Sequence, residues 1–242
     1  MRFISLANRN IKEVYRDHVS MGLGLGLPIV LLVLFASIGK NAPIKIFTAN
    51  ALTPAVIVFS FGFLTLYSAM LLARDRESAF LTRLLTTPLK PSDFILSYIL
   101  PLLPIALLQI IVCFVVGSLY GVTINLSIIF ALIILFTLAF ACIGIGMIIG
   151  SLFSESQNGG IGSMVIVIIS LFSGAWMDLK MVGGIFGAVG YALPFAYALD
   201  ATRGILNGSG WGDIIIVFYW VLGYALIFFI GGILCFRWRT KR

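Results

Sequence analysis

The stretch from Phe94 to Ser154 reads FILSYILPLLPIALLQIIVCFVVGSLYGVTINLSIIFALIILFTLAFACIGIGMIIGSLFS and contains no charged residue. A transmembrane helix needs about 20 apolar residues, so this stretch is too long for one span. It is interrupted at residues 120–125, where Gly121 and Asn125 are typical of a turn. The stretch therefore predicts a hairpin of two membrane-spanning helices, near residues 94–119 and 126–150.

The rest of the chain has the same character. Of its 242 residues, 61% are hydrophobic and 10% are charged, whereas an average soluble domain is roughly half apolar and a quarter charged. We therefore expect one all-α polytopic membrane domain over residues 1–242, with six transmembrane helices and no separate soluble catalytic domain. The further charge-free runs predict spans near residues 19–39, 50–73, 157–177 and 213–236.

Positive charge predicts the orientation of these spans, because cytoplasmic loops are rich in Lys and Arg. With six spans and both termini inside, twelve Lys and Arg residues lie inside and four lie outside, whereas a seventh span would give eight on each side. The glycine-rich segment 178–212 is then an outer, re-entrant helical element between spans five and six. Within it, Asp200 and Arg203 favour a local ion pair, with a substrate-binding couple as the alternative.

In the first 18 residues, apolar side chains recur every three to four positions and charged side chains occupy many of the positions between them. This pattern predicts an amphipathic helix in the cytoplasmic interface of the membrane. A solvated helix packed on a partner is the alternative. The apolar positions are Phe3, Leu6, Ala7, Ile11, Val14 and Tyr15.

The sequence lacks the residues that ion-coupled transport, catalysis, metal binding and nucleotide binding usually require. No span interior contains Asp, Glu, Lys, Arg or His, and proton- or ion-coupled carriers usually need such groups. The chain's one histidine, His18, has no partner at catalytic or metal-ligand spacing, and its three cysteines lie far apart in apolar runs. A phosphate-binding loop is missing as well. We expect no cofactor, no metal, no nucleic-acid binding and no enzymatic activity in this chain.

The loop between spans two and three, residues 74–93, differs from the other connections. A charged cluster at Arg74, Arg76 and Glu77 leads into a short apolar-periodic stretch, which Thr87 and Pro88 end. This pattern predicts a short amphipathic helix along the membrane that is joined to both spans and suits a lever for a partner protein. The alternative is a loop that is merely well anchored.

This loop and its context resemble the permease subunits of type-2 ABC exporters, the drug, antibiotic and O-antigen exporter family. In that family an Arg-x-Arg/Glu cluster, a Gly-Thr-x-Glu-x-Leu stretch and a Thr-Pro follow the second span. This chain departs from the pattern at Ala79, Phe80 and Thr82. The matching residues are Arg74, Arg76, Glu77, Leu84, Thr87 and Pro88.

The resemblance implies a permease dimer driven by two separate cytoplasmic ABC ATPase subunits, which bind the ATP and Mg. The matching loop residues and Arg83 are then expected to couple the permease to the ATPase. Closure of the ATPases would rock the permease halves and release the transported compound outward by alternating access. The resemblance implies the cell membrane of a bacterium, and the count of Lys and Arg predicts that both termini are cytoplasmic. Phe-rich spans without charge favour a hydrophobic or amphipathic compound such as a drug, an antibiotic, a lipid-like molecule or a peptide.

Other functions remain open at this point. The chain could be an ATP-independent channel or gradient-driven carrier, an intramembrane enzyme, or a membrane scaffold or sensor that transports nothing. The sequence also leaves open which compound is transported and whether the second permease is a copy or a paralogue.

Overall fold

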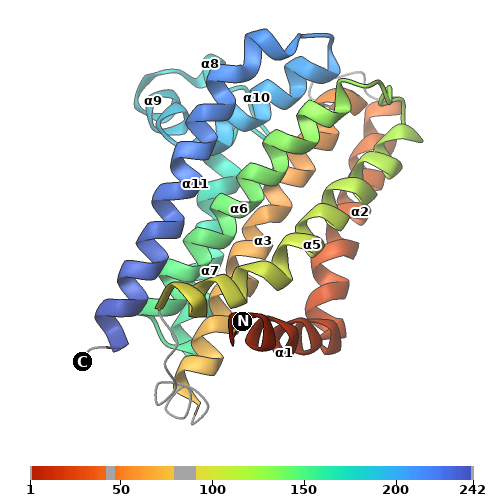
Figure 1. The fold of residues 1–242 in the computed structure, drawn as a ribbon. Helices are drawn as coiled ribbons and strands as arrows, with labels where there is room; N and C mark the ends of the chain where they lie inside the picture. The colour runs from red at the N-terminus through yellow and green to blue at the C-terminus, as the bar shows by residue number, and fades with distance from the viewer. Residues whose placement is uncertain (1, 42–46, 79–90, 241–242) are drawn as a thin grey trace.

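The structure is a computed structural model that describes residues 2–41, 47–78 and 91–240. Long helices lie side by side in a bundle (Figure 1), and no strand occurs in the described ranges, so the prediction of an all-α fold is confirmed. The helices are α1 (Arg2–Arg16), α2 (His18–Asn41), α3 (Ala49–Glu77), α5 (Pro91–Ser118), α6 (Ile128–Leu152), α7 (Glu155–Phe172), α8 (Leu179–Val182), α9 (Gly184–Ala192), α10 (Pro194–Leu206) and α11 (Trp211–Thr240).

Five of the described helices, α2, α3, α5, α6 and α11, are long and apolar enough to cross a membrane. The chain is thus a multi-pass membrane protein, as predicted. The predicted hairpin is α5 and α6, and its turn contains Gly121 at a φ of 109°, a backbone conformation that glycine adopts at little cost.

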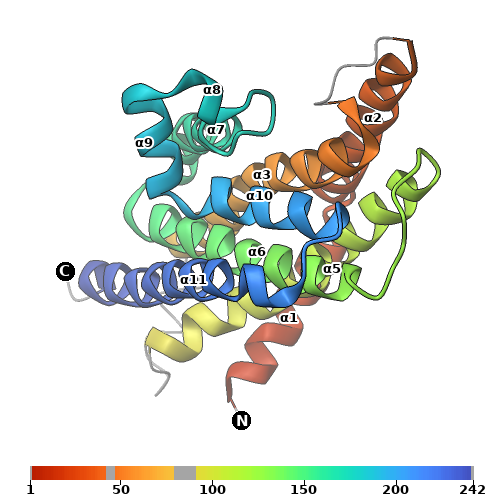
Figure 2. The ribbon, with the colours of Figure 1, turned by 90° about the horizontal axis from the view of Figure 1, so that it is seen from above.

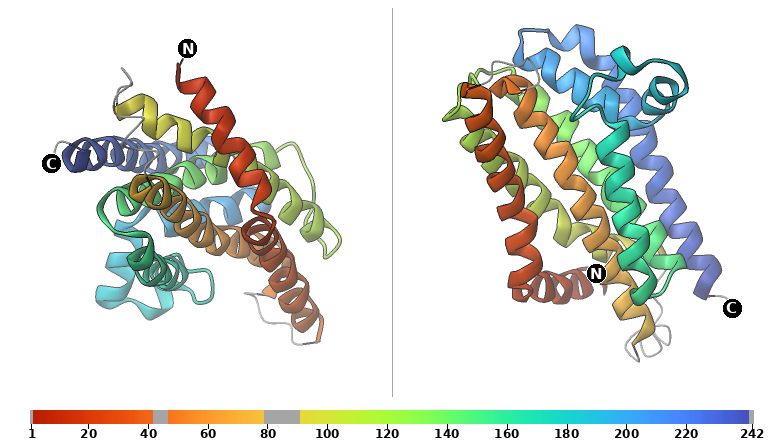
Figure 3. Two further views of the ribbon diagram at one scale, coloured as in Figure 1. Left: turned by 90° about the horizontal axis from the view of Figure 1, so that it is seen from below. Right: turned by 180° about the vertical axis from the view of Figure 1, so that it is seen from behind.

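Helix α7 corresponds to the predicted fifth span, but it ends at Phe172 rather than near residue 177. It is shorter and more polar at its start than the five helices above. Its 18 residues extend about 27 Å at 1.5 Å per residue, close to the ~30 Å thickness of the hydrocarbon layer. Figure 3 shows α7 running beside α3 along the height of the bundle. Its N-terminus has the capping box that Ser154 and Gln157 predict.

Helix α3 lies at the centre of the bundle and packs most tightly against α6. A Cβ atom at Gly146 would lie 2.5 Å from the carbonyl oxygen of Thr65, and one at Gly150 would lie 2.5 Å from that of Ala69. Small residues at this spacing let two membrane helices approach closely. The glycines of α6 therefore serve packing within the chain.

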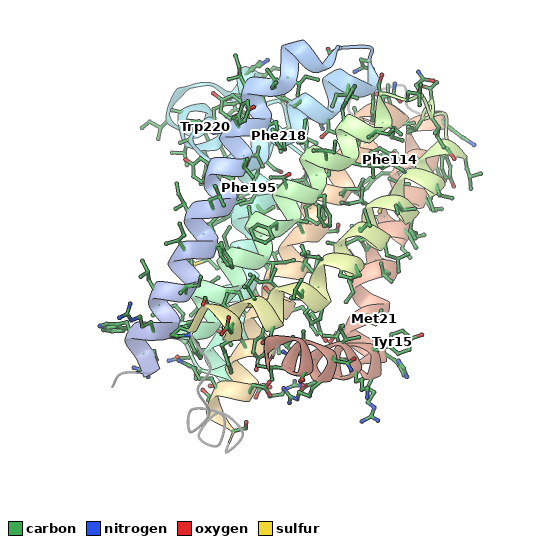
Figure 4. The ribbon with its side chains drawn as sticks, in the orientation of Figure 1. Tyr15, Met21, Phe114, Phe195, Phe218 and Trp220 are labelled. Carbon is green, nitrogen blue, oxygen red and sulfur yellow. The ribbon has the colours of Figure 1, made fainter. Side chains whose placement is uncertain are left out.

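Helix α1 lies across the end of the bundle and packs on α5 (Figures 1 and 3). It buries Leu6, Ala7 and Val14 but leaves Ile11 47% and Tyr15 71% exposed, and Tyr15 points away from the bundle in Figure 4. The predicted amphipathic helix is present, and its apolar residues are divided between a packed face and an exposed face. That division fits a helix that rests on the protein and meets the membrane interface as well.

The predicted re-entrant element comprises α8, α9 and α10 and lies at the end of the bundle opposite α1 (Figure 1). Helices α9 and α10 meet at an angle of 83°, and α10 lies over α3 and α6 (Figure 2). Arg203 of α10 donates hydrogen bonds to the carbonyl oxygens of Ala51 (3.1 Å), Gly174 (3.1 Å) and Ala175 (3.3 Å). Asp200 instead accepts one from the Tyr191 hydroxyl at 2.8 Å.

The predicted Asp200–Arg203 ion pair is therefore not formed. Carbonyl groups just beyond the C-terminus of α7 need hydrogen-bond donors, and the Arg203 guanidinium supplies them while it also reaches α3. Arg203 thus fastens α10 to the end of the bundle, while the re-entrant position of α8–α10 in the membrane stays a prediction.

Candidate functional site: the last turn of helix α3

The charged cluster predicted from sequence forms the last turn of α3, at the same end of the bundle as α1. Four successive residues, Arg74, Asp75, Arg76 and Glu77, point in different directions because successive helical residues are rotated by 100°. Asp75 therefore faces α1 and α5, Arg76 faces the end of α6, and Arg74 and Glu77 both face the start of α7. The contacts of this turn join α3 to four other helices.

Asp75 is the buried member of the turn, with 3% of its surface exposed. Both of its carboxylate oxygens accept hydrogen bonds from the Arg9 guanidinium of α1, with Nη2 3.0 Å from Oδ1 and Nη1 in contact with Oδ2. The Tyr98 hydroxyl of α5 also donates to Oδ2. A buried carboxylate is tolerated only when it is paired and hydrogen-bonded, so Asp75 requires both partners. This ion pair and hydrogen bond connect α1, α3 and α5.

One further contact holds α1 against α5, and a second lies within α1 itself. The Asn10 side chain donates to the carbonyl oxygen of Ser97 on α5 at 3.0 Å, and Asn10 is fully buried. Arg9 also forms an ion pair of 2.8 Å with Glu13. Burial, and then the negative charge of Asp75, raise the pKa of Glu13, although Arg9 partly offsets them. The hydrogen bond with Asp75 raises the pKa of Arg9.

Arg76 caps the C-terminal end of α6. Its Nη1 and Nη2 atoms donate hydrogen bonds of 2.5 Å to the carbonyl oxygens of Ser151 and Phe153. The last carbonyls of a helix have no partner within the helix and bear partial negative charge. A guanidinium with two parallel donors satisfies them and holds α6 to α3.

Arg74 and Glu77 reach the start of α7 through Glu155. The Arg74 Nε atom lies 2.9 Å from the Glu155 carboxylate, and the Glu155 backbone N–H donates to the Glu77 carboxylate at 3.2 Å. Arg74 is 51% exposed, so this pair contributes little to stability by itself. It does fix the direction in which α7 leaves the turn after α6.

The predicted coupling residues are only partly within the described chain. The structure brings Arg74, Arg76 and Glu77 together in one helical turn and engages them with the chain's own helices. Their contact with an ATPase stays a prediction. The other predicted coupling residues, Arg83, Leu84, Thr87 and Pro88, lie outside the described residues, as do Ala79, Phe80 and Thr82.

The sequence analysis missed Asp75 and its partners Arg9 and Tyr98. A signal for Asp75 was present: Ser68, Leu71, Leu72 and Asp75 follow the spacing of one helical face, and all four are buried. This face becomes the inner face of α3, so a carboxylate at its end needs a cation. Sequence alone could not place Arg9, because it is 66 residues away from Asp75.

The described residues contain no group of three or more His, Cys, Asp and Glu side chains that could hold a metal ion. Cys113, Cys142 and Cys235 are free thiols. The contacts of the α3 turn are ion pairs and hydrogen bonds between helices, which suit the transmission of movement.

Comparison with known proteins identifies the family of the chain. The model of the family described as "ABC-2 type transporter" matches residues 1–207. The transport permease ycf38 of Porphyra purpurea is 29% identical over 221 residues, covering 86% of this chain and 74% of the relative. The ycf38 permease of Pyropia yezoensis is 28% identical with the same coverage. This chain therefore belongs to the ABC-2 type transporter family, the membrane permeases of ABC transporters that work with an ABC ATPase.

Proposed function

We propose that the chain is the permease of an ATP-driven exporter that moves a hydrophobic or amphipathic compound, for example a drug, out of the cell by alternating access. Two permeases, either two copies or a copy and a paralogue, assemble with two cytoplasmic ATPase subunits. The ATPases bind the ATP and Mg and press on the loop at 74–93. The permease itself has no catalytic role.

The observation that supports this mechanism most directly is the set of contacts made by the last turn of α3. A push on the segment that follows Glu77 reaches α1 through Asp75, α6 through Arg76 and α7 through Glu155. Arg9, Asp75 and Tyr98 further join α1 to α5. A force applied at one point therefore displaces several spans together.

The distribution of charge supports a cytoplasmic position for this end of the bundle. Helix α1, the last turn of α3 and the last turn of α11 all contain basic residues, and the three lie at one end of the bundle (Figure 1). Cytoplasmic surfaces of membrane proteins are enriched in Lys and Arg. On this basis both termini and the ATPases lie on the cytoplasmic side of the cell membrane, and α8–α10 lie outside.

The apolar interior supports the class of compound. Helices α2, α5 and α6 have no charged residue between their first and last turns. Transport of a bare ion or proton usually requires charged side chains at mid-membrane. An apolar or amphipathic molecule needs few fixed charges and can cross among side chains of the same character.

Reconstitution tests the proposal. The permease is placed in liposomes with an ABC ATPase that co-purifies with it, and ATP-dependent accumulation of a fluorescent lipophilic dye is measured. We expect accumulation only when ATP, Mg and the ATPase are present, and hydrolysis that the permease stimulates. An ATPase variant without its phosphate-binding lysine is the control. Dye movement without nucleotide would identify a channel or carrier, and hydrolysis without movement would identify a scaffold or sensor.

A further inference from the structure

Helix α1 has an open groove of about 500 Å³ on its surface. The described residues that line it all belong to α1: Ser5, Asn8, Arg9, Lys12, Glu13 and Arg16. They recur every three or four positions, so they lie along one side of the helix. Figure 4 shows nitrogen-bearing side chains on the side of α1 that faces away from the bundle. A hydroxyl, an amide and three cationic groups at one groove are donors that suit a phosphate group.

The acidic side chains of α1 and of the corner that follows it are already engaged within the chain. Glu13 pairs with Arg9 at 2.8 Å, and Arg9 also binds Asp75. The Asp17 carboxylate, between α1 and α2, accepts a hydrogen bond of 3.1 Å from the backbone N–H of Ser20. Neither acidic side chain pairs with the two remaining cations of the groove.

Lys12 and Arg16 are these two cations. Both residues are exposed, and neither forms an ion pair with any residue that the structure describes. They are four positions apart, so they are neighbours on the helix surface, where two like charges repel each other. An anion between them relieves this repulsion and gains charge-assisted hydrogen bonds. The geometry therefore favours an anionic partner.

Two exposed apolar residues indicate which kind of anionic partner fits. Ile11 is 47% and Tyr15 is 71% exposed, and each directly precedes one of the two cations. One residue corresponds to 100° of helical rotation, so an apolar stripe lies beside the basic one. Such a helix binds where acyl chains meet headgroups, with its long basic side chains among anionic headgroups. The acidic surface of another protein would match the cations but not the apolar stripe.

The position of α1 gives lipid access to this surface. The helix lies across the end of the bundle (Figure 1), and its N-terminal end extends past the other helices when the bundle is viewed from below (Figure 3). Its buried face packs on α5. The basic and apolar stripes are on the part of the helix that the rest of the chain leaves uncovered.

From these features we propose that α1 binds anionic phospholipid of the leaflet at its end of the bundle. The headgroup phosphate lies in the groove, where Lys12 and Arg16 donate hydrogen bonds to it. The acyl chains lie beside Ile11 and Tyr15. Binding needs no ATPase, so the proposal does not depend on ATP-driven export. The lipid holds the helix that Arg9 joins to the last turn of α3.

The test uses the full chain in phosphatidylcholine nanodiscs, with no ATPase or nucleotide. The probes are phosphatidylglycerol and phosphatidylcholine with the same diazirine in one acyl chain, each added at the same low mole fraction. Mass spectrometry gives the ratio of phosphatidylglycerol to phosphatidylcholine labelling for each peptide. For α1 we expect a ratio of about five or more, the gain from one Lys or Arg at an anionic surface. For residues 107–115 of α5, whose exposed side chains are all apolar, we expect a ratio close to one.

Two double variants and two changes of condition make the test specific. Lys12→Gln with Arg16→Gln should bring the α1 ratio close to one. Arg237→Gln with Arg239→Gln is the matched control, since it removes the same charge from exposed positions of α11, and it should leave the α1 ratio unchanged. Raising NaCl from about 0.1 M to about 1 M shortens the Debye length from about 10 Å to about 3 Å and should lower the wild-type ratio. Excess glycerol 3-phosphate, which has no acyl chains, should not displace the lipid probe.

A wild-type ratio of one, or a ratio that Lys12→Gln with Arg16→Gln leaves unchanged, would overturn the proposal. So would an equal loss in the α11 variant, which would show a general effect of positive charge, or displacement by glycerol 3-phosphate, which would show a site for free phosphate. The salt series on the wild type decides the matter even where the α1 variant does not fold. Loss of the lipid preference leaves ATP-driven export intact as a proposal, and a lipid preference without export would contradict the proposed function alone.

Discussion

Asp75 illustrates how one residue can set the position of a whole element. Its buried carboxylate is shared between Arg9 of α1 and Tyr98 of α5. The sequence points to the neighbouring Arg74, Arg76 and Glu77 as a candidate site, because they form a charged cluster directly after an apolar run. Their partners could not be predicted, since the choice among distant side chains depends on how the spans are arranged.

Removing Arg9 tests this ion pair. Arg9→Ala leaves the Asp75 carboxylate buried with Tyr98 as its one remaining named partner, and loss of hydrogen bonds to a charged group costs about 1.5–3 kcal/mol. Because Arg9 is 37% exposed, we expect the lower part of this range. The free energy of unfolding in detergent, or the Tm where unfolding is irreversible, measures the loss. Lys12→Ala, at an exposed site of the same helix, should leave both values nearly unchanged.

A double substitution separates the ion pair from a general effect on α1. When both partners are replaced, as in Arg9→Ala with Asp75→Asn, no buried charge remains unpaired. The double variant should therefore be more stable than Arg9→Ala alone. If the two losses simply added, the two residues would not be coupled, and the contact could not transmit movement from α3 to α1.

At the scale of elements, features that depend on neighbouring residues could be predicted from the sequence. The turn between α5 and α6 and the capping box of α7 depend on residues a few positions apart, and both were predictable. The early end of α7 was not. Just after α7 ends, Gly174 adopts a φ of 75°. Arg203, from a later helix, donates a hydrogen bond to the carbonyl oxygen of Gly174. A contact between distant segments therefore overrides the length of the apolar run.

The contact between α3 and α6 gives a prediction at this scale. Gly146→Ala would place a methyl group 2.5 Å from the carbonyl oxygen of Thr65, and such overpacking costs about 1–3 kcal/mol. We expect a lower Tm and reduced export, because α6 must move away from α3. Gly160→Ala on α7 is the control, since its new methyl group would meet no atom within 4 Å. Equal Tm values for the two variants would show that the α3–α6 contact is not tightly packed.

At the scale of the whole molecule, the bundle has two chemically different ends. The described termini lie together at the end that contains α1 and the last turn of α3, and α8–α10 lie at the other (Figure 1). The order and approximate limits of the spans were predictable, because hydropathy and charge act along the sequence. The half-open cavity among α2, α3 and α5 was not, because it depends on which faces of these helices meet.

The proposed orientation predicts different accessibility for the two ends. Ser5→Cys of α1 and Asn207→Cys after α10 each introduce a thiol at an exposed position, on a background with Cys235→Ser, because Cys113 and Cys142 are buried. A membrane-impermeant maleimide should label Asn207→Cys in intact cells, and Ser5→Cys only after the cells are permeabilised. The Cys235→Ser parent, without a new thiol, gives the background. Labelling of both positions from outside would place α1 and α10 on the same side of the membrane. The reverse pattern would put the last turn of α3 out of reach of a cytoplasmic ATPase, and the coupling mechanism would fail with it.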